Sequence, residues 1–260
     1  MKNYLELLEK ISVDGELRQD RTGVGTYSLF GERLEFNLKD GFPLVTTKKV
    51  FFKGIVTELL WMLKGSTNIK FLKDNGVNIW NEWADEFGEL GPVYGYQWRN
   101  FNGIGVDQIK NCIDQIRNKP HSRRIMVVTA NPAQEHLMAL PPCPSMFQFY
   151  VGKNGLSMQV YQRSCDIFLG GPFDIASYAL LLSMVAKVTG LEPYKLIYTF
   201  GDVHLYTNHL QQALEQMLRD PKPLPKLELS DKYDIDSFGF DDIKLVGYEP
   251  HPAIKAEIAV

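Results

Sequence analysis

Cysteine, which stabilises small secreted proteins through disulfide bonds, is scarce in this chain of 260 residues. Cys112, Cys143 and Cys165 are the only ones, and an odd number without a secretory signal fits a reducing cytoplasm. No pair of Cys or His residues has zinc-finger spacing, so no metal is expected. Long apolar runs are also lacking, so we expect neither a membrane span nor a membrane partner.

Strong charge of either sign is absent as well. The net charge is -3 and the pI is near 6.0, which argues against nucleic acid as a partner but leaves room for one local basic pocket. The chain has no internal repeat, low-complexity segment or flexible linker. Helical and strand patterns interleave without a regular βαβ count, and 45% of the residues are hydrophobic. These features predict one α+β domain over residues 1–260.

Periodicity predicts where most elements lie. Helices are expected at residues 1–15, 52–63, 68–75, 106–119 and 175–189, and at 207–219 with Thr207 as its cap. Strands are expected at 26–36, just after Arg124, twice within 141–178, and at 195–199, followed by a turn that carries Asp202, His204 and Tyr206.

Cys143 stands out because prolines surround it. Pro141 and Pro142 precede it and Pro144 follows it, and proline both restricts the backbone and removes a hydrogen-bond donor. A thiol held at a rigid corner before a strand is a candidate nucleophile, and a cation such as Arg163 would favour the reactive thiolate. A buried structural cysteine is the alternative explanation.

Two basic segments are candidate anion sites. Arg18, Arg21 and Thr22 lead into a glycine-containing loop, which could hold an anion through guanidinium and backbone N–H groups or could simply be a solvated turn. The spacing matches neither a Walker nor a dinucleotide motif. Arg123 and Arg124 are neighbours in an expected strand and so point to opposite faces. Both could be used at a bulge or at a subunit boundary.

Glu58 and the tryptophans each allow two interpretations. Glu58 interrupts an apolar helical pattern, where a carboxylate is costly unless it is paired or acts as an acid or base, or else it lies on the polar edge of the helix. Trp80, Trp83 and Trp98 fall close together in a stretch broken by glycine and proline. They could form a stacking site for a planar ligand or could be part of the core.

These residues belong to longer motifs that resemble the thymidylate synthase family. The motifs are DRTG, FPLVTTKK, ELLWMLKG, GPVYGYQWR, SRR, PPC, QRSCDIFLGGPF, IASYALL, GDVHLY and HPAIKAEIAV. They follow one another in the family's order over nearly the whole chain and need no large insertion. The resemblance implies an α+β homodimer with a mixed sheet at the subunit interface. It also implies 5,10-methylenetetrahydrofolate as one-carbon donor to carbon 5 of a pyrimidine nucleotide.

The resemblance assigns a role to each matching residue. Cys143 would add to carbon 6 of the ring, while Glu58 and Tyr94 would order the waters that move protons. The residues that would bind the nucleotide are Arg21, Gln162, Arg163, Ser164, Asp174, His204 and Tyr206, with Arg123 and Arg124 reaching the phosphate from the other subunit. The residues that would bind the folate are Lys48, Ile79, Trp80, Asp166, Leu169, Gly170, Phe173 and Val260.

Three positions depart from the family pattern. Asp174 stands where asparagine is usual, and an ionised carboxylate only accepts hydrogen bonds, which suits the exocyclic amine of cytosine. Asp174 could also act in catalysis by stabilising a proton added to the ring, which would make the ring a better electrophile towards the thiolate. Pro144 replaces a histidine of the water network, and Phe200 replaces a glycine for a reason that the sequence does not supply. The combination resembles the deoxycytidylate hydroxymethylase branch, in which water captures the one-carbon unit, and a viral member would act in the host cytoplasm. Reductive methylation of dCMP or dUMP and a non-catalytic nucleotide- or RNA-binding role are the alternatives.

Overall fold

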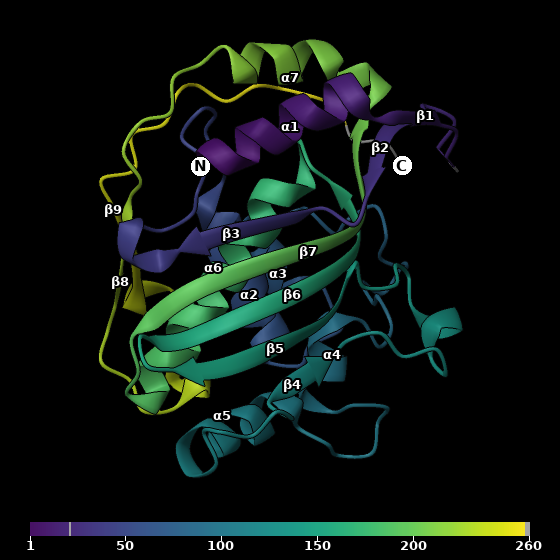
Figure 1. The fold of residues 1–260 in the computed structure, drawn as a ribbon. Helices are drawn as coiled ribbons and strands as arrows, with labels where there is room; N and C mark the ends of the chain where they lie inside the picture. The colour runs from purple at the N-terminus through teal and green to yellow at the C-terminus, as the bar shows by residue number, and fades with distance from the viewer. Residues whose placement is uncertain (21, 258–260) are drawn as a thin grey trace.

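One mixed sheet organises the structure (Figure 1). The computed structural model describes residues 1–20 and 22–257. The strands lie in the order β1 (Glu16–Arg18), β2 (Thr26–Phe30), β7 (Pro193–Tyr206), β6 (Gly155–Asp166), β5 (Pro144–Gly152) and β4 (Met126–Val128), and β3 (Arg33–Asn37) also pairs with β7. The β6–β7 pair is parallel, while the other pairs of this sheet are antiparallel. The predicted α+β fold with a mixed sheet is confirmed.

The helices leave one face of the central strands uncovered. They are α1 (Lys2–Asp14), α2 (Phe52–Leu63), α3 (Lys70–Asp74), α4 (Tyr94–Arg99), α5 (Gln108–Asn118), α6 (Gly170–Thr189) and α7 (Leu210–Met217). Figure 1 shows α2, α3 and α6 behind the sheet, α1 beside α7 at one end, and no helix in front of β5, β6 and β7. A separate hairpin-like pair, β8 (Lys226–Leu229) and β9 (Ile243–Val246), lies at the edge of the fold.

Helix α6 forms the centre of the core. Residues such as Leu180, Leu181 and Leu182 are fully buried, as expected for a helix that is apolar on all sides. By length and composition α6 could cross a membrane, so the expectation that no apolar run reaches that length is wrong for this segment. However, 83% of its apolar stretch is buried inside the fold, which is typical of a core helix.

The starting point of α6 also differs from the prediction. The helix begins at Gly170 instead of residue 175, so the sequence GGPFD forms its first turn and does not precede it. Asp166 Oδ1 accepts hydrogen bonds from the backbone N–H groups of Phe168 and Leu169, at 3.0 and 3.1 Å, and so initiates the turn. Pro172 is tolerated because a first-turn N–H has no partner within a helix.

The predicted strand at 26–36 is two strands. β2 pairs with the second half of β7 and β3 with the first half, and Gly31 adopts a positive φ of 85° between them. The N–H of Gly31 donates to Gly201 O, and Phe200 N–H donates to Glu32 O, so β7 bridges the break. The alternation of side chains continues across the break, which is why periodicity alone misses it.

The segment after residue 199 is extended instead of turned. β7 continues to Tyr206, so Asp202, His204 and Tyr206 lie on a strand that pairs with β2 and β6. Thr207 opens a short 3-10 helix, Thr207–His209, before α7, and its hydroxyl donates to Val24 O at 2.8 Å instead of capping the helix. The expected turn and cap were wrong because these contacts to the 20–25 loop cannot be read from local sequence.

Helices α2, α3 and α5 lie close to their predicted bounds, and of these three only α5 has a side-chain cap. α2 begins and ends where predicted. α5 starts two residues later than predicted because Asp107 accepts from the N–H of Lys110 at 2.9 Å. α3 is shorter than predicted, and Asn68 accepts from the N–H of Lys70 at 2.9 Å just before it.

Phe200 fills the interior next to Gln162. It is 1% exposed, lies opposite Gln162 in the β6–β7 pair, and contacts the ring of Tyr198 at 5.4 Å. The unusual phenyl group is therefore a core residue beside the strand position that carries a buried amide. This packing supplies the account of Phe200 that the sequence lacked.

Truncating Phe200 should destabilise the protein. We expect Phe200→Ala to lower the free energy of unfolding by about 3–5 kcal/mol, because it leaves a cavity in a close-packed core. Urea denaturation followed by circular dichroism would measure the change. Phe87, which is 76% exposed, supplies the control, since Phe87→Ala should cost less than about 0.5 kcal/mol. A loss at Phe200 as small as that control would show that the site collapses without a cavity.

Candidate active site

Cys143 lies directly before β5, and hydrogen bonds to its backbone N–H and carbonyl groups fix its position. Its N–H donates to the hydroxyl of Tyr94 at 3.2 Å, and its carbonyl accepts the backbone N–H of Arg163 at 2.9 Å. Tyr94 reaches this position because α4 lies very close to α2. A Cβ on Gly95 would lie 2.2 Å from Met62 O, so the approach requires glycine. The structure thus places a half-buried thiol at a fixed corner, as the prolines predict.

The Arg163 side chain lies against the same corner. Its Nε donates to Pro142 O at 3.2 Å and its Nη2 to Pro141 O at 2.8 Å, which orients the guanidinium beside the Cys143 loop. Gly201 allows this close packing of β7 on β6, since a Cβ there would lie 2.7 Å from Arg163 O. The predicted proximity of Cys143 and Arg163 is therefore present.

Asp174 is oriented by a buried amide. Gln162 Nε2 donates to Asp174 Oδ2 at 2.7 Å and to Ser164 O at 3.1 Å, which fixes the direction of the amide group. The Oε1 atom of Gln162 is buried and has no hydrogen-bond partner among the described residues. Burial raises the pKa of Asp174 to about 6, against the effect of the Gln162 hydrogen bond. Asp174 is consequently still mostly ionised at neutral pH.

Glu58 and Trp80 form a second pair. Trp80 Nε1 donates to Glu58 Oε1 at 2.6 Å. Burial raises the pKa of Glu58 to about 7, and the negative charge of nearby Asp174 adds to the shift. A carboxyl group that titrates near neutral pH can both accept and donate protons. This environment favours the acid–base interpretation of Glu58 over a solvated helix edge.

Two tyrosines that the sequence analysis did not select lie in the same interior. Tyr178 on α6 and Tyr198 on β7 are buried, and neither hydroxyl has a hydrogen-bond partner among the described residues. Burial raises the pKa of each phenol well above its ordinary value, with Asp174 contributing to both and Glu58 to that of Tyr178. Buried hydroxyl groups normally have a hydrogen-bond partner, so these two are candidates to bond to a ligand or to water. Sequence offers no signal for them beyond two tyrosines in apolar segments.

The residues predicted to bind folate gather around the start of α6. Asp166 precedes the helix, Gly170 opens it, and Leu169 and Phe173 are partly buried against the core. Lys48 is buried nearby, where its Nζ donates to Phe168 O at 2.5 Å and lies 3.4 Å from the centre of the Phe168 ring. Burial lowers the pKa of Lys48 to about 7, although Asp166 opposes the shift.

The tryptophans divide between the two interpretations. Trp80 contacts Trp83 and Tyr94 edge-on at 5.8 and 5.6 Å, and Ile79 beside it is partly buried. Trp98 is 1% exposed and packs on Phe147, so it is a core residue. Trp80 is 7% exposed and also packs in the core, so of these two residues only Trp80, beside Glu58, stays a candidate for the ligand site.

His204 and Tyr206 lie side by side on β7. The His204 Nδ1–H donates to Asp202 Oδ1 at 2.9 Å, and Asp202 also pairs with Arg18 at 3.1 Å. The rings of His204 and Tyr206 are 5.3 Å apart and nearly perpendicular. Arg18 is thus engaged with Asp202, and the Thr22 hydroxyl bonds to Asp20 at 2.8 Å, so the described residues of the basic loop are paired with acidic side chains.

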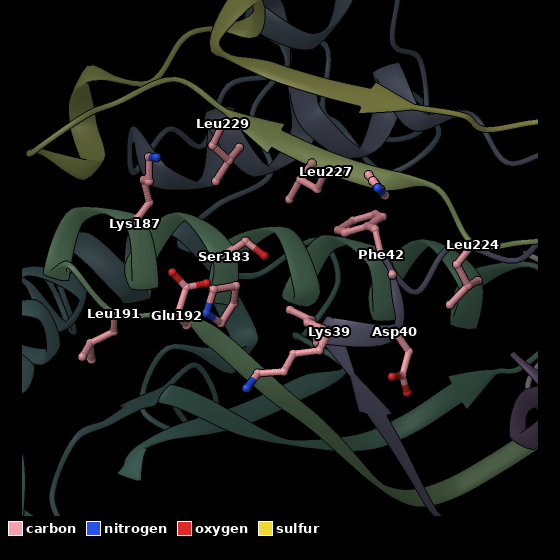
Figure 2. Close-up of a pocket in the computed structure, with 14 residues that line it drawn as sticks. Lys39, Asp40, Phe42, Ser183, Lys187, Leu191, Glu192, Leu224, Leu227 and Leu229 are labelled. Carbon is pink, nitrogen blue, oxygen red and sulfur yellow. The ribbon is translucent and has the colours of Figure 1, made fainter. Parts of the chain in front are cut away.

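Two of the remaining candidates are described and lie apart from this cluster. Arg123 and Arg124 are exposed on the segment before β4. Arg21 and Val260 lie outside the described residues. A separate open pocket of about 460 Å³ lies between α6, the 38–42 segment and β8, and Figure 2 shows its lining residues. Its lining includes Phe42, Lys187 and Leu227, and it contains none of the candidate site residues.

The site brings the candidate nucleophile Cys143 and the exposed cation Arg163 to the edge of an interior that holds the carboxyl groups of Glu58 and Asp174. Tyr94 and Tyr178 interact electrostatically with both Cys143 and Asp174, which links the thiol to the carboxylate side of the site. Such a set can activate an electron-poor ring by addition and then move protons through water. A family model described as thymidylate synthase matches residues 2–260. The chain therefore belongs to the thymidylate synthase family, whose members carry out folate-dependent one-carbon transfer to a pyrimidine nucleotide.

Proposed function

We propose that this member is a dCMP hydroxymethylase, which produces 5-hydroxymethyl-dCMP and tetrahydrofolate. The observation that carries the proposal is the Asp174–Gln162 pair. Because Gln162 Nε2 occupies Asp174 Oδ2, the other carboxylate oxygen can accept from a base. The exocyclic amine of cytosine is a donor, whereas the 4-oxo group of uracil would place an acceptor against an acceptor. Such a contact costs about 1–3 kcal/mol when buried.

Cys143 supplies the first bond of the reaction. Its thiolate adds to carbon 6, and the displaced electron pair makes carbon 5 nucleophilic. The folate supplies a one-carbon unit to carbon 5 and departs as tetrahydrofolate. This departure requires loss of the carbon 5 proton to water ordered by Glu58 and Tyr94, since the electron pair left on carbon 5 expels the folate nitrogen, which takes up a proton, and forms the exocyclic methylene. Addition of water oxygen to this methylene returns electrons to carbon 6, expels the Cys143 thiolate and completes the hydroxymethyl group.

The interior polar atoms support capture by water. Glu58, with a pKa of about 7, can take the proton that the attacking water loses. The hydroxyls of Tyr178 and Tyr198 and the Oε1 of Gln162, which have no hydrogen-bond partner in the described part of the chain, could bind ordered water beside Asp174. Pro144 removes the histidine usual at this position, which fits a changed network at the ring edge.

Reductive methylation remains the second candidate because of Trp80. Its indole N–H engages Glu58 Oε1 at 2.6 Å, and its ring is 7% exposed, which would shield the methylene from water. In that reaction hydride from the folate, not water, would complete the group and dihydrofolate would be the second product.

The folate and phosphate sites form part of the same proposal. Trp80, Ile79, Leu169 and Phe173 offer apolar surface, and Asp166 offers a carboxylate for the pterin, so the residues suit a folate. Arg163 and Ser164 would hold the nucleotide phosphate with Arg21. His204 and Tyr206 would bind the sugar hydroxyl, Lys48 the glutamyl tail, and Val260 would close over the ligands.

A homodimer would complete the phosphate site. The face of β5, β6 and β7 that carries no helix in Figure 1 exposes Tyr150 by 70% and Tyr161 by 38%. Arg163 is two residues after Tyr161 on β6, so its side chain lies on the same face of the sheet. A second copy packed there would bring Arg123 and Arg124 towards Arg163. A reducing cytoplasm would keep Cys143 as a thiol.

Product identity tests the proposal directly. Purified protein is incubated with methylenetetrahydrofolate and either dCMP or dUMP, and the nucleotide is analysed by mass spectrometry. We expect one hydroxymethyl group on dCMP and no rise in dihydrofolate absorbance. A methyl product accompanied by dihydrofolate would establish reductive methylation, and faster turnover of dUMP than of dCMP would contradict the role of Asp174.

A further inference from the structure

The side-chain amide of Gln162 is hydrogen-bonded on one side only. Its Nε2 donates both to Asp174 Oδ2 at 2.7 Å and to Ser164 O at 3.1 Å. Its Oε1 is buried and has no hydrogen-bond partner within the described residues, in a side chain that is 1% exposed. An amide oxygen only accepts hydrogen bonds, so the group that this amide needs is a donor.

The strands on either side of β6 place no side-chain donor directly opposite Gln162. Its partners across the sheet are Pro144 on β5 and Phe200 on β7, and neither side chain carries a polar group. Asp202, two residues beyond Phe200, is a hydrogen-bond acceptor that bonds to His204 at 2.9 Å. A donor for Gln162 Oε1 must therefore come from another position.

Tyr198 brings such a donor to the same face of the sheet. It precedes Phe200 by two residues on β7, so its side chain points to the side of the sheet on which Gln162 lies. Its ring lies 5.4 Å from that of Phe200 and 6.0 Å from that of Tyr178 on α6. The hydroxyls of Tyr178 and Tyr198 are buried and have no hydrogen-bond partner in the part of the chain that the structure describes. One acceptor and two hydroxyl groups therefore lie in the interior between β6, β7 and α6.

Tyr198 is the cleaner probe of the two hydroxyl groups. Burial raises the pKa of both phenols, and the charge of Asp174 adds to both shifts. Cys143 and Glu58 also contribute to the pKa of Tyr178, so a change at Tyr178 would act on the reacting groups as well. A change at Tyr198 tests the surroundings of the amide with the smaller disturbance.

We propose that Tyr198 is a positioning residue, whose hydroxyl serves Gln162 Oε1 through one bound water and so holds the amide against Asp174. The water would donate to Oε1 and accept from the Tyr198 hydroxyl. The Tyr178 hydroxyl offers a third partner, and three hydrogen bonds are typical of a buried water. Tyr198 touches neither substrate nor the reacting atoms and acts through Gln162. The inference rests on the proposed role of Asp174 in reading the base.

Loss of the Gln162 bond would weaken the recognition of cytosine in two ways. The carboxylate would no longer be held in one orientation, and the pKa of Asp174, which this bond lowers, would rise. A protonated carboxyl group can donate a hydrogen bond, which suits the 4-oxo group of uracil and opposes the amine of cytosine. The other ionisable groups that interact with Asp174 would be unchanged: Glu58 on α2, Tyr94 on α4, Cys165 and Asp166 on β6, and Tyr178 on α6.

Tyr198→Phe removes the hydroxyl and keeps the ring. We expect the ratio of kcat/KM for dUMP to that for dCMP at pH 7.5 to rise about threefold to tenfold, as the loss of one hydrogen bond predicts. In a Gln162→Leu background the same change should alter the ratio by less than about twofold, because its effect passes through the amide. Calorimetric binding of the two nucleotides gives the same comparison if turnover of the double variant is too slow to measure.

Tyr4→Phe is the matched control. Tyr4 is also completely buried, but its hydroxyl donates directly to Ile167 O at 2.8 Å. Its loss should lower the midpoint of urea unfolding and leave the ratio for the two nucleotides within about twofold of wild type. The same pattern in Tyr198→Phe would show that the Tyr198 hydroxyl is merely structural and would overturn the inference.

A high-resolution crystal structure of the wild-type protein tests the inference even if Tyr198→Phe fails to fold. It should show one water within hydrogen-bond distance of both Gln162 Oε1 and the Tyr198 hydroxyl. Absence of this water, or an equal effect of Tyr198→Phe with and without the Gln162 amide, would overturn the inference. A wild-type preference for dUMP would instead contradict the proposed function, and neither the water nor the coupling to Gln162 depends on that preference.

Discussion

Replacing Cys143 with alanine is expected to abolish turnover of both dCMP and dUMP. Loss of the nucleophile of a covalent enzyme lowers kcat by roughly 10⁶-fold in a well-studied protease, because the remaining site cannot replace the covalent bond. Carbon 5 of a pyrimidine is a poor nucleophile until a group adds at carbon 6, so no partial route remains. Product formation measured by mass spectrometry should therefore be below detection.

The structure indicates that Cys143→Ala should fold. The bonds to Tyr94 and Arg163 are made by the backbone N–H and carbonyl of residue 143, which alanine retains. Cys112 offers a matched control, since it is buried in α5 and burial raises the pKa of its thiol to about 12. Cys112→Ala should keep turnover and form a covalent adduct with a 5-fluoropyrimidine nucleotide. An adduct with Cys143→Ala would show that another residue is the nucleophile.

The Cys143 corner could be recognised from sequence because its determinants are local. Three prolines within four residues define the backbone around the thiol, and the structure places that thiol at the start of β5. Helix α2 was also predicted at its observed bounds, since its apolar pattern and its length are both local properties. Motifs over the full chain then indicated the family.

The features that the sequence did not predict depend on contacts between residues far apart in the chain. The division between β2 and β3 depends on pairing with β7, more than 150 residues further along the chain. The hydroxyls of Tyr178 and Tyr198 become candidate site groups only because the packing of α6 and β7 brings them near Asp174. Similarly, Lys48 is buried against Phe168, although a lysine in FPLVTTKK would ordinarily be expected at the surface.

Phe200 is a core residue that lies beside the polar pair proposed to read the base. The sequence marks it as unusual but gives no reason. The structure places it in the core opposite Gln162, the residue that directs Asp174. A change that looks unrelated to chemistry therefore lies next to the polar pair that would read the base.

Asp174→Asn is expected to shift the preference from dCMP towards dUMP. Gln162 Nε2 is fixed by Ser164 O as well as by residue 174, so it should keep donating towards position 174. The asparagine must then turn its carbonyl to Gln162 and its Nδ2 donor to the base. That donor matches the 4-oxo group of uracil and opposes the amine of cytosine.

The expected change is large because both substrates are affected. A mismatched buried polar contact costs about 1–3 kcal/mol. The variant removes such a mismatch with dUMP and creates one with dCMP, so the two changes add in the ratio. The ratio of kcat/KM for dUMP to that for dCMP should rise by roughly 30-fold to 10⁴-fold. Initial rates with each nucleotide, measured at pH 7.5 where Asp174 with its pKa of about 6 is ionised, give this ratio.

A remote carboxylate provides the control for charge. Asp236 pairs with Arg99 through a side chain that is 51% exposed, so Asp236→Asn removes the same charge away from the base-reading pair. The ratio of kcat/KM for dUMP to that for dCMP in Asp236→Asn should equal the wild-type ratio. If Asp174→Asn kept the wild-type preference for dCMP while Cys143→Ala was inactive, the protein would still be a covalent pyrimidine enzyme. Another group would then have to read the amino edge, and Gln162, whose buried Oε1 is an unpartnered acceptor within the described chain, is the group that the structure offers.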